Sequence, residues 1–353
     1  MDSSDALVVR LNAELFPISV TERRLLQYYG VRPVEIEAAT PEAIIPHVRE
    51  AHAVCVVSAM LPAEVIDSLD QCRLISRLGN GTDKIDVSRA TQRGIVVSNV
   101  PDFCTDEMAD YVMAMVLSFS REIARMARHM RAGTFRQARA ESLDLRGLST
   151  RTLGLVGWGT SAHAVTRRAL PFGMTVIATR RDLSRASPEA DELGVDIVGL
   201  DELLERADYV SLHLPLTTQT RGLLNRERLA RMKRGAYFIN ASRGEIVDED
   251  ALAELLHAGY LGGAGIDTYG VIDIFGETEE VPTHPLVTAD NVIATPHVSA
   301  LSVESSRAVA AGSVHNLVSV LGGCMPRSDH IVNRSVVPRF PLEPHDPNLF
   351  EED

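Results

Sequence analysis

Short apolar runs, separated by longer amphipathic stretches, fill the first hundred residues. We predict strands at the runs and helices where apolar residues recur at helical spacing, the second of them opened by a proline. The predicted strands are residues 6–11, 53–57, 74–78 and 95–98, and the predicted helices are residues 20–29 and 61–68. Strands that alternate with helices are typical of parallel βαβ units. The pattern therefore predicts an α/β unit.

A second series of the same kind begins after a long helical stretch. Residues 105–132, rich in Met, Ala and Leu, are predicted as one helix that ends at Gly133. Six further strands are predicted at residues 152–156, 175–178, 209–212, 236–239, 263–266 and 292–294. Six strands with intervening helices are the content of a complete doubly wound dinucleotide-binding domain. Two α/β units in tandem follow.

The last part of the chain differs from both series. After Pro326 it is rich in proline and acidic residues, ending FPLEPHDPNLFEED, and offers little to pack. We predict an extended arm or disorder there. The length of 353 residues exceeds one typical domain, which agrees with two units.

Composition and charge exclude several classes of protein. The net charge of −13 argues against nucleic acid as a partner, because phosphate contacts need a basic surface. No apolar run approaches the roughly 18 residues of a membrane span, and the start lacks a secretory signal pattern. Four widely spaced cysteines without a C-x-x-C pair fit buried thiols in a reducing cytoplasm, and no metal site is expected.

The predicted strand at 152–156 runs directly into a glycine-rich loop. Gly157, Gly159 and Ala162 form G-x-G-x-x-A, and Thr160 and Ser161 occupy the positions between. The first glycine permits a tight turn, the second allows the backbone to approach a pyrophosphate, and the small third residue allows close helix–strand packing. With a strand before it and a helix after it, this loop predicts dinucleotide binding.

The end of the next strand selects between the two nicotinamide cofactors. An acidic residue there binds the ribose 2′-hydroxyl, whereas arginine accommodates a 2′-phosphate. The strand ends Thr179-Arg180-Arg181, and the first acid, Asp182, comes two residues later than expected. Two guanidinium groups and a hydroxyl suit a phosphate, so NADP is predicted, with NAD as the alternative. The other interpretation is a pair of solvated arginines.

Three later strands end in side chains that carry chemistry. Arg243 follows one strand, Asp267 ends another, and His297 follows the third. In doubly wound folds, ligands bind at these carboxyl ends. Arginine binds and polarises an oxo-carboxylate, and histidine can transfer a proton near neutral pH. Together these residue types predict the reduction of a 2-oxo acid.

The sequence resembles the D-isomer-specific 2-hydroxyacid dehydrogenase family, which includes phosphoglycerate dehydrogenases and glyoxylate/hydroxypyruvate reductases. The resemblance extends from about Arg77 to about Ser302 and is weaker before it. The segments that carry it are Arg77-Leu-Gly-Asn-Gly-Thr-Asp-Lys-Ile-Asp86, Asn99-Val-Pro101, the loop at 157–162, Leu212-His-Leu-Pro-Leu-Thr217, Met232-Lys233, Asn240-Ala-Ser-Arg-Gly244, Asp267 and Thr295-Pro-His297.

The resemblance implies a role for each matching position. Arg243 would contact the oxo and carboxylate oxygens of the substrate, and His297 would be the acid/base. The backbone amides around Asn80 and Gly81 would bind the carboxylate, and Asp267 would anchor the nicotinamide carboxamide. The remaining matching positions are Arg77 in the substrate site, and Pro215 and Ala241 in the cofactor site.

The resemblance also implies a domain organisation. Residues 1–101 and 298–353 would form a flavodoxin-like substrate domain, and residues 102–297 would form a Rossmann cofactor domain inserted into it. The long helix after Thr105 would serve a homodimer interface.

Two positions depart from the family pattern. The family pairs its histidine with a glutamate, but the equivalent spacing here falls on Ile272. Asp273 is the first candidate for the acid that orients His297, Glu277 is the second, and a histidine without an acid is the third. Relatives also often carry an arginine where this chain has Thr160-Ser161, and Arg180 and Arg181 would compensate in charge.

The function predicted from these residues is an NADP-preferring 2-oxo acid reductase. Hydride would pass to C2 while His297 protonates the oxygen and Arg243 stabilises its charge. Two alternatives remain open at the level of sequence: a corepressor-like scaffold of the same fold, and a dehydrogenase of a small anion such as phosphite or formate. No motif identifies the side chain of the substrate.

Overall fold

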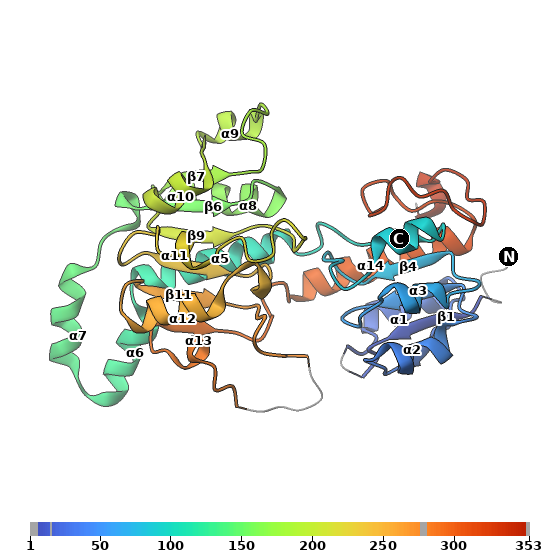
Figure 1. Ribbon diagram of the computed structural model, residues 1–353, viewed down its shortest axis with the longest axis horizontal. Helices are drawn as coiled ribbons and strands as arrows, with labels where there is room; N and C mark the ends of the chain where they lie inside the picture. The colour runs from blue at the N-terminus through green and yellow to red at the C-terminus, as the bar shows by residue number, and fades with distance from the viewer. Residues whose placement is uncertain (1–5, 15, 276–280, 351–353) are drawn as a thin grey trace. The chain divides into compact units, whose positions relative to one another are not determined.

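The computed structural model describes residues 6–14, 16–275 and 281–350. The chain divides into two compact units (Figure 1). Unit 1 comprises residues 1–103 and 302–353, and unit 2 comprises residues 104–301. The sequence predicted boundaries after residues 101 and 297, a few residues earlier. Within the described residues, no helix is both long and apolar enough to cross a lipid bilayer.

Unit 1 contains a five-stranded parallel sheet in the order β2-β1-β3-β4-β5. This is the flavodoxin-like order. The strands are β1 (Val8–Leu11), β2 (Val34–Ile36), β3 (Ala53–Val56), β4 (Leu74–Arg77) and β5 (Val96–Ser98). The sequence analysis missed β2, because its three residues are not buried and form no apolar run.

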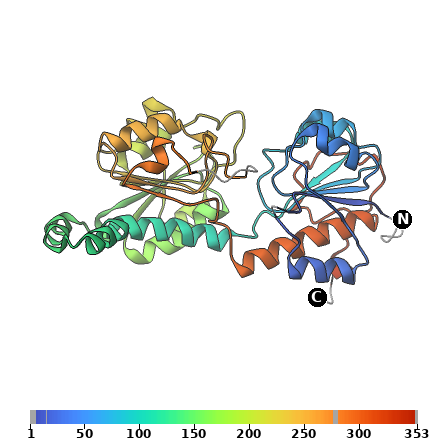
Figure 2. The ribbon, with the colours of Figure 1, turned by 90° about the horizontal axis from the view of Figure 1, so that it is seen from below.

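Helices cover both faces of this sheet, so the residues of its central strands β1 and β3 are all buried. The helices are α1 (Val20–Tyr28), α2 (Pro41–Val48), α3 (Ala63–Asp67), α4 (Val87–Gln92) and α14 (Val303–Leu321). Alternate strand residues enter two separate cores, one of which includes residues of α1 and α14. Figure 2 shows these two helices together on one face. Such two-sided burial produces continuous apolar strands in parallel sheets.

The segment after Pro326 packs on unit 1, contrary to the prediction that it offers little to pack. Ile331 forms an antiparallel bridge with Ser98, and the Val332 amide donates to the Val97 carbonyl at 2.9 Å. Asn333 is buried and accepts from the Val97 amide at 2.8 Å. These contacts cover the free edge of β5. The polar composition hid them, because they are made by backbone and amide groups rather than by apolar side chains.

Unit 2 contains a seven-stranded parallel sheet in the order β12-β11-β10-β9-β6-β7-β8. The order reverses between β6 and β9, which is the switch point of a Rossmann fold. Its strands are β6 (Thr152–Val156), β7 (Thr175–Thr179), β8 (Asp196–Ile197), β9 (Tyr209–Leu212), β10 (Tyr237–Asn240), β11 (Gly263–Ile266) and β12 (Val292–Ala294). The two-residue β8 was too short to predict.

Two groups of helices cover the faces of the second sheet (Figure 2). The first group includes α5 (Thr105–Ser120), α8 (Thr160–Ala169) and α9 (Pro188–Leu193). The second includes α10 (Leu200–Arg206), α11 (Arg226–Leu229) and α12 (Glu249–His257), and the short α13 (Pro285–Thr288) contacts α12. The α/β architecture of both units confirms the predicted fold class.

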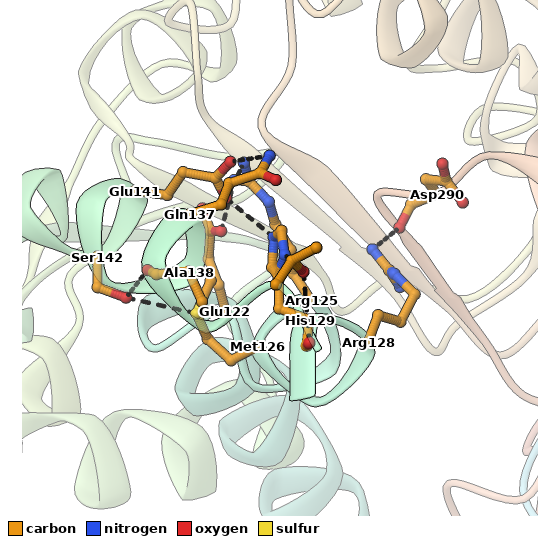
Figure 3. A network of polar contacts seen from close by, with 11 residues as sticks. Glu122, Arg125, Met126, Arg128, His129, Gln137, Ala138, Glu141, Ser142 and Asp290 are labelled. Atoms are coloured by element: carbon orange, nitrogen blue, oxygen red, sulfur yellow. Dashed lines mark hydrogen bonds and ion pairs between the residues drawn. The ribbon is translucent and has the colours of Figure 1, made fainter. Parts of the chain in front are cut away.

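The predicted helix over 105–132 is two helices. Glu122 has a φ of 46° and separates α5 from α6 (Ile123–Ala132), after which α7 (Phe135–Glu141) follows. No residue of α6 or α7, all of them described, is buried. A polar network joins the two helices (Figure 3), in which Arg125 pairs with both Glu122 and Glu141. Here polar contacts rather than an apolar core stabilise the arrangement.

Candidate active site

The glycine loop between β6 and α8 is shaped for a close approach of ligand. Gly157 has a φ of +113°, and a Cβ there would collide with the carbonyl oxygen of His213. A Cβ on Gly159 would meet nothing within 4 Å, so the space beside it is open. Ala162 is fully buried where α8 packs on the sheet. The open space at the start of α8, a ten-residue helix, fits a dinucleotide pyrophosphate.

His213 connects this loop to the neighbouring strand β9. Its Nδ1 lies 3.0 Å from the Ser161 hydroxyl, and its Nε2 lies 3.0 Å from the Ser211 hydroxyl. Removal from water lowers the pKa of His213 to about 4. The imidazole is therefore neutral at physiological pH and adds no charge beside the phosphate loop. The sequence analysis treated Ser161 as a departure from the family pattern, and the structure gives it this histidine as a partner.

Two arginines follow the end of β7, and the nearest acid, Asp182, is hydrogen-bonded to a neighbouring serine. Thr179 is buried, Arg180 is half-buried, and exposed Arg181 donates to the Gln219 amide oxygen at 3.0 Å. The Asp182 carboxylate accepts from the Ser184 hydroxyl at 2.6 Å and the Ser184 amide at 3.0 Å. These bonds from Ser184 lower the pKa of Asp182. Asp182 thus stabilises a local turn, as expected for an acid beyond the ribose position.

Arg243 lies at the carboxyl end of β10 on a backbone fixed by its neighbours. The Asn240 side chain donates to the Arg243 carbonyl at 2.9 Å, and one Arg243 Nη donates to the Ser242 carbonyl at 2.7 Å. A Cβ on Gly244 would collide with the backbone of Tyr269 and Gly270. Only glycine therefore lets the loop after β10 contact the loop after β11, which begins at Asp267.

Asp267 is fully buried and binds the turn that carries His297. One carboxylate oxygen accepts from the Thr295 hydroxyl at 2.6 Å and from the Val298 amide at 2.9 Å. The other accepts from the Ser299 amide at 2.9 Å. Three donors on one carboxylate make a strong junction between β11 and the segment after β12. The resemblance implied only a cofactor contact for Asp267, so this function was not predicted.

His297 has a left-handed backbone conformation, with a φ of 57°. This conformation is uncommon for a residue with a Cβ and is found most often at functional sites. The Asp267 bonds to the next two amides stabilise it. The half-buried imidazole lies 5.3 Å from the Phe275 ring, centroid to centroid. The local fold thus fixes the direction of the one histidine predicted to be the acid/base.

Two tyrosines and a glutamate that the sequence analysis missed support the same turn. Thr295 donates its only hydroxyl hydrogen to Asp267, so the Tyr111 hydroxyl, 2.6 Å away, must donate to Thr295. Tyr269 donates to the carbonyls of Ile266 and Thr295, each at 3.0 Å. Buried Glu249 accepts from the amides of Gly270 and Val271. No sequence signal marks these residues, because their partners are distant along the chain.

The structure describes only one of the two candidate acids for His297. Asp273 accepts from the Phe275 amide at 3.0 Å and so shapes the turn that places the Phe275 ring beside His297. Glu277 lies outside the residues that the structure describes. Asp273 as the partner of His297 stays a prediction.

Three other predicted cofactor residues lie at carboxyl ends of the unit 2 sheet. Thr160 is the first residue of α8. Ala241 is buried directly after β10. Pro215 is exposed in the segment after β9, where its carbonyl accepts from the Thr220 hydroxyl at 2.7 Å. The structure therefore brings these positions to the edge of the sheet that also carries the glycine loop.

In unit 1, the loop after β4 has all its carbonyl oxygens occupied. The Arg77 guanidinium donates to the carbonyls of Leu78 and Gly81. The Val100 amide donates to the Gly79 carbonyl at 2.9 Å, and the Asn99 side chain donates to the Asn80 carbonyl at 2.8 Å. Arg77 thus stabilises the loop itself, whereas the sequence analysis assigned it to the substrate site.

The amides of this loop are in the opposite situation. Those of Asn80 and Gly81 donate to no acceptor in the part of the chain that the structure describes. Gly79 has a φ of +137°, and a Cβ there would collide with the Arg77 guanidinium. Two adjacent N–H groups without acceptors can both donate to one anion. The loop is therefore suited to bind a carboxylate.

The fold and these sites define the class of protein, a nicotinamide-dependent oxidoreductase of the doubly wound type. Comparison with known proteins makes the class specific. Residues 113–299 match the family described as "D-isomer specific 2-hydroxyacid dehydrogenase, NAD binding domain". A glyoxylate reductase of Korarchaeum cryptofilum is 36% identical over 298 residues, which cover 84% of this chain and 87% of that protein.

Two solved structures are similar over nearly the whole chain. The D-lactate dehydrogenase of Aquifex aeolicus, in complex with NAD and lactic acid, has a TM-score of 0.81 at 26% identity and covers 92% of this chain and 99% of its own. The NADPH-dependent glyoxylate/hydroxypyruvate reductase of Sinorhizobium meliloti, in complex with NADP and malonate, has a TM-score of 0.76 at 28% identity and covers 95% and 99%.

This chain belongs to the D-isomer-specific 2-hydroxyacid dehydrogenase family. It is an oxidoreductase that uses a nicotinamide dinucleotide to interconvert a 2-oxo acid and a D-2-hydroxy acid. The predicted family and reaction are confirmed. The cofactor that the family implies fits the residues present, because Gly157 and Gly159 leave the space that a pyrophosphate requires.

Proposed function

We propose that this enzyme reduces a small 2-oxo acid with NADPH, using Arg243 and His297. The observation that carries the proposal is the junction at Asp267. It fixes the turn of His297 and lies in the loop that Gly244 allows to contact the Arg243 loop. A proton donor and a guanidinium are thus attached to one rigid edge of the cofactor unit.

Each residue has a defined task in the proposed reaction. When bound, the dihydronicotinamide supplies the hydride that C2 of the substrate accepts. Arg243 binds the oxo and carboxylate oxygens and stabilises the negative charge on the oxo oxygen. His297 donates the proton that converts this oxygen to a hydroxyl. The amides of Asn80 and Gly81 bind the carboxylate, and Asp267 orients the nicotinamide while it stabilises the His297 turn.

Asp273 is the proposed partner of His297. A carboxylate near the imidazole stabilises its protonated form, which the reductive reaction requires. Asp273→Asn should therefore lower kcat and move the alkaline fall of reductive kcat/KM to lower pH. Glu277→Gln is the matched control and should leave the profile unchanged. An exchange of the two outcomes would assign the role to Glu277, and two unchanged profiles would mean that neither acid acts on His297.

NADP preference is proposed from the end of β7. Arg180 and Arg181 stand where an acid would repel a 2′-phosphate, and Asp182 is engaged by Ser184. Arg180→Asp should shift the ratio of kcat/KM values toward NADH by about tenfold or more, the worth of a charge-assisted phosphate contact. Arg206→Asp, an exposed arginine that pairs with Glu202, is the control. A wild-type preference for NADH would overturn the proposal.

A substrate panel tests the proposed function as a whole. Glyoxylate, hydroxypyruvate, pyruvate and longer 2-oxo acids are each assayed with NADPH and NADH, and phosphite and formate with the oxidised cofactors. We expect turnover of a 2-oxo acid with NADPH as the better cofactor. Oxidation of phosphite or formate without reduction of any 2-oxo acid would overturn this substrate class.

A homodimer through the arm formed by α6, α7 and residues 142–146 is proposed as well. The arm buries none of its described helical residues and exposes Ile123, Met130, Phe135 and Leu143. Exposed apolar side chains on an arm without a core are suited to a second copy of the chain. Sedimentation should give twice 38.5 kDa. Met130→Glu with Leu143→Glu should give the monomer, whereas Val337→Glu, equally exposed but in unit 1, should not.

A cytoplasmic location is the last part of the proposal. Cys55 and Cys72 are buried thiols, and burial raises the pKa of each to about 12. Thiols of this kind are ordinary in a reducing compartment. Fractionation of the native host cells tests the location.

A further inference from the structure

Four polar residues from separate parts of unit 1 form one chain of hydrogen bonds. The chain ends at the loop of residues 78–81 after β4, which we name the carboxylate loop. The Asn99 side chain donates to the Asn80 carbonyl at 2.8 Å and lies 3.2 Å from the Asn80 side-chain oxygen. The Asn316 side chain, on α14, donates to the Asn99 carbonyl at 3.1 Å. The Asn99 amide donates to the His330 carbonyl at 3.0 Å. The Asn99 peptide groups are thus bound from two sides.

His330 completes this arrangement, which we name the asparagine network (Asn80, Asn99, Asn316, His330). Its Nδ1 lies 2.9 Å from the Asn316 side-chain oxygen. That oxygen can only accept, so Nδ1 carries the hydrogen of the neutral imidazole. This assignment requires the side-chain nitrogen of Asn316 to face Asn99, which agrees with its 3.1 Å bond to the Asn99 carbonyl. The three side-chain donors then point in one direction, from His330 through Asn316 and Asn99 to Asn80.

Burial makes the outer part of the network costly to disturb. Asn316 is 2% exposed and His330 is 8% exposed. A buried polar group that loses its partner costs more than the bond itself contributes. Desolvation lowers the pKa of His330. Arg327 and His315 lower it further, whereas Asp329 and Asp102 raise it. The imidazole therefore stays neutral at physiological pH, and its bond to Asn316 does not depend on a charge.

Steric fit supports the same connection. Gly312 lies on α14 one turn before Asn316, and a Cβ on it would come within 2.8 Å of Val100 Cγ1. Val100 is the residue whose amide donates to the Gly79 carbonyl. The absence of a side chain at Gly312 therefore lets α14 lie against the residues that bind two carbonyls of the loop.

We propose that Asn99, Asn316 and His330 are positioning residues that orient the Asn80–Gly81 amides toward the substrate carboxylate. The inference rests on the proposed function, which gives these amides the carboxylate to bind. The network binds the carbonyl side of the loop, and so directs the amide side outward. One of its residues, His330, lies after Pro326, in the segment that the sequence analysis expected to pack little. Loosening the network should weaken substrate binding without changing the chemical step.

The chain offers a matched control for a purely structural role. Asn333 is also a buried asparagine of the C-terminal segment, and it binds β5 at the Val97 amide and the Ile95 carbonyl. It contacts no residue of the carboxylate loop through these bonds. Asn316→Leu and Asn333→Leu remove the same group from the same kind of site. Both should lower the melting temperature, but only the first should affect the loop.

The experiment measures two quantities on full-length enzyme. The first is the deuterium exchange, without substrate, of the hydrogen-bonded amides of Leu78, Gly79, Asn99 and Val100. The second is KM and kcat for the 2-oxo acid with the highest kcat/KM in the panel. In Asn316→Leu and His330→Leu we expect faster exchange of the loop, a KM raised about tenfold, and a kcat within about threefold of wild type. His330→Asn, which keeps a donor near the Nδ1 position, should recover most of the loss.

Each outcome decides a separate point. Unchanged exchange of these four amides in both leucine variants would overturn the network. Faster exchange with an unchanged KM would overturn its link to the carboxylate. An equal rise in KM in Asn333→Leu would reduce the effect to general destabilisation and also overturn it. If wild-type enzyme reduces no 2-oxo acid, the proposed function fails by itself, while the exchange measurement still decides whether the network positions the loop.

Discussion

The two units contain sheets of the same kind, yet they place chemistry at the strand ends in opposite ways. In unit 2 the groups are side chains: Arg243 follows β10, Asp267 follows β11 and His297 follows β12. In unit 1 the group is the backbone of residues 79–81 after β4, and the side chains around it bind its carbonyls. One sheet thus presents ionisable groups, and the other presents peptide amides.

This difference matches the two requirements of the proposed reaction. Proton transfer and charge stabilisation need groups that titrate or carry a full charge, and only side chains provide these. Binding a carboxylate needs fixed N–H donors, which a glycine-containing loop provides without a change of charge. Substitutions in unit 2 should therefore affect kcat, and substitutions around the unit 1 loop should affect KM.

The largest effect is expected at His297. His297→Ala should lower kcat by about 10²–10⁴-fold, the usual contribution of a positioned acid/base, because His297 is the proton donor of the proposed reaction. Binding of NADPH, measured by fluorescence titration, should change little. His257→Ala, at the end of α12, is the control. Near-normal turnover of the alanine variant would remove His297 from the mechanism.

The next largest effect on activity is expected for Arg243→Ala. In the proposed reaction its guanidinium binds the substrate in the ground state and stabilises the oxygen charge in the transition state, so both KM and kcat should worsen. We expect a loss of about 10²–10³-fold in kcat/KM, the cost of removing one charge-stabilising donor. Arg243→Lys keeps the charge but lacks the planar fork, and should recover only part. A change in KM alone would mean that Arg243, like the unit 1 loop, only binds the substrate and does not take part in the chemical step.

A third prediction concerns stability at acid pH, where the two units are alike. Each has a neutral imidazole beside a strand end, His213 in unit 2 and His330 in unit 1, and the pKa of each is lowered by desolvation. Unfolding raises these pKa values, so the unfolded chain binds more protons and stability falls as pH drops below about 6.5. For His213, with a folded pKa of about 4, the loss between pH 7 and 5 is about 2 kcal/mol.

Urea unfolding at pH 7 and pH 5 measures this difference. His213→Gln should be less stable than wild type at pH 7, because it loses the partner of Ser161 or Ser211. Its further loss on going to pH 5 should be smaller than that of wild type by about 2 kcal/mol. An equal pH dependence in the two proteins would contradict the assignment of a neutral His213.

The smallest effect is expected at Arg77. Arg77→Met removes the donors to the Leu78 and Gly81 carbonyls but leaves the backbone amides in place. KM should rise about tenfold, the loss of one to two hydrogen bonds, with kcat nearly unchanged. Arg89→Met, which removes an exposed arginine of α4, is the control. A large fall in kcat would break the distinction between the units, because it would assign chemistry to unit 1.

Much of this site could be predicted from the sequence because its signals are local. Gly157 lies in a turn that lacks room for a Cβ, Gly159 borders open space, and the spacing of the two glycines is readable without a structure. Arg243, Asp267 and His297 were predicted because each lies within three residues of the end of a strand, and the carboxyl ends of parallel strands meet at one edge. The strand periodicity likewise predicted most of both sheets.

Other elements could not be read because their determinants are not local. The break at Glu122 occurs within a continuous helical pattern, where no proline or glycine marks it. The C-terminal segment packs through Asn333 and backbone groups, so its composition suggested an arm or disorder. The NAD or NADP choice and the acid for His297 also depend on which side chains turn toward a ligand.

The sequence by itself determined the α/β class, the dinucleotide loop and the identity of the charged groups, because strand period, glycine spacing and residue type act over a few neighbours. Only the tertiary structure decided what surrounds those groups. It gave Asp267 the task of binding the His297 turn, gave Arg77 the carbonyls of its own loop, and connected His330 to Asn80 through two asparagines. The bond from Asn316 to Asn99 joins residues 217 positions apart, and such contacts form only when the sheet has brought its strand ends into place.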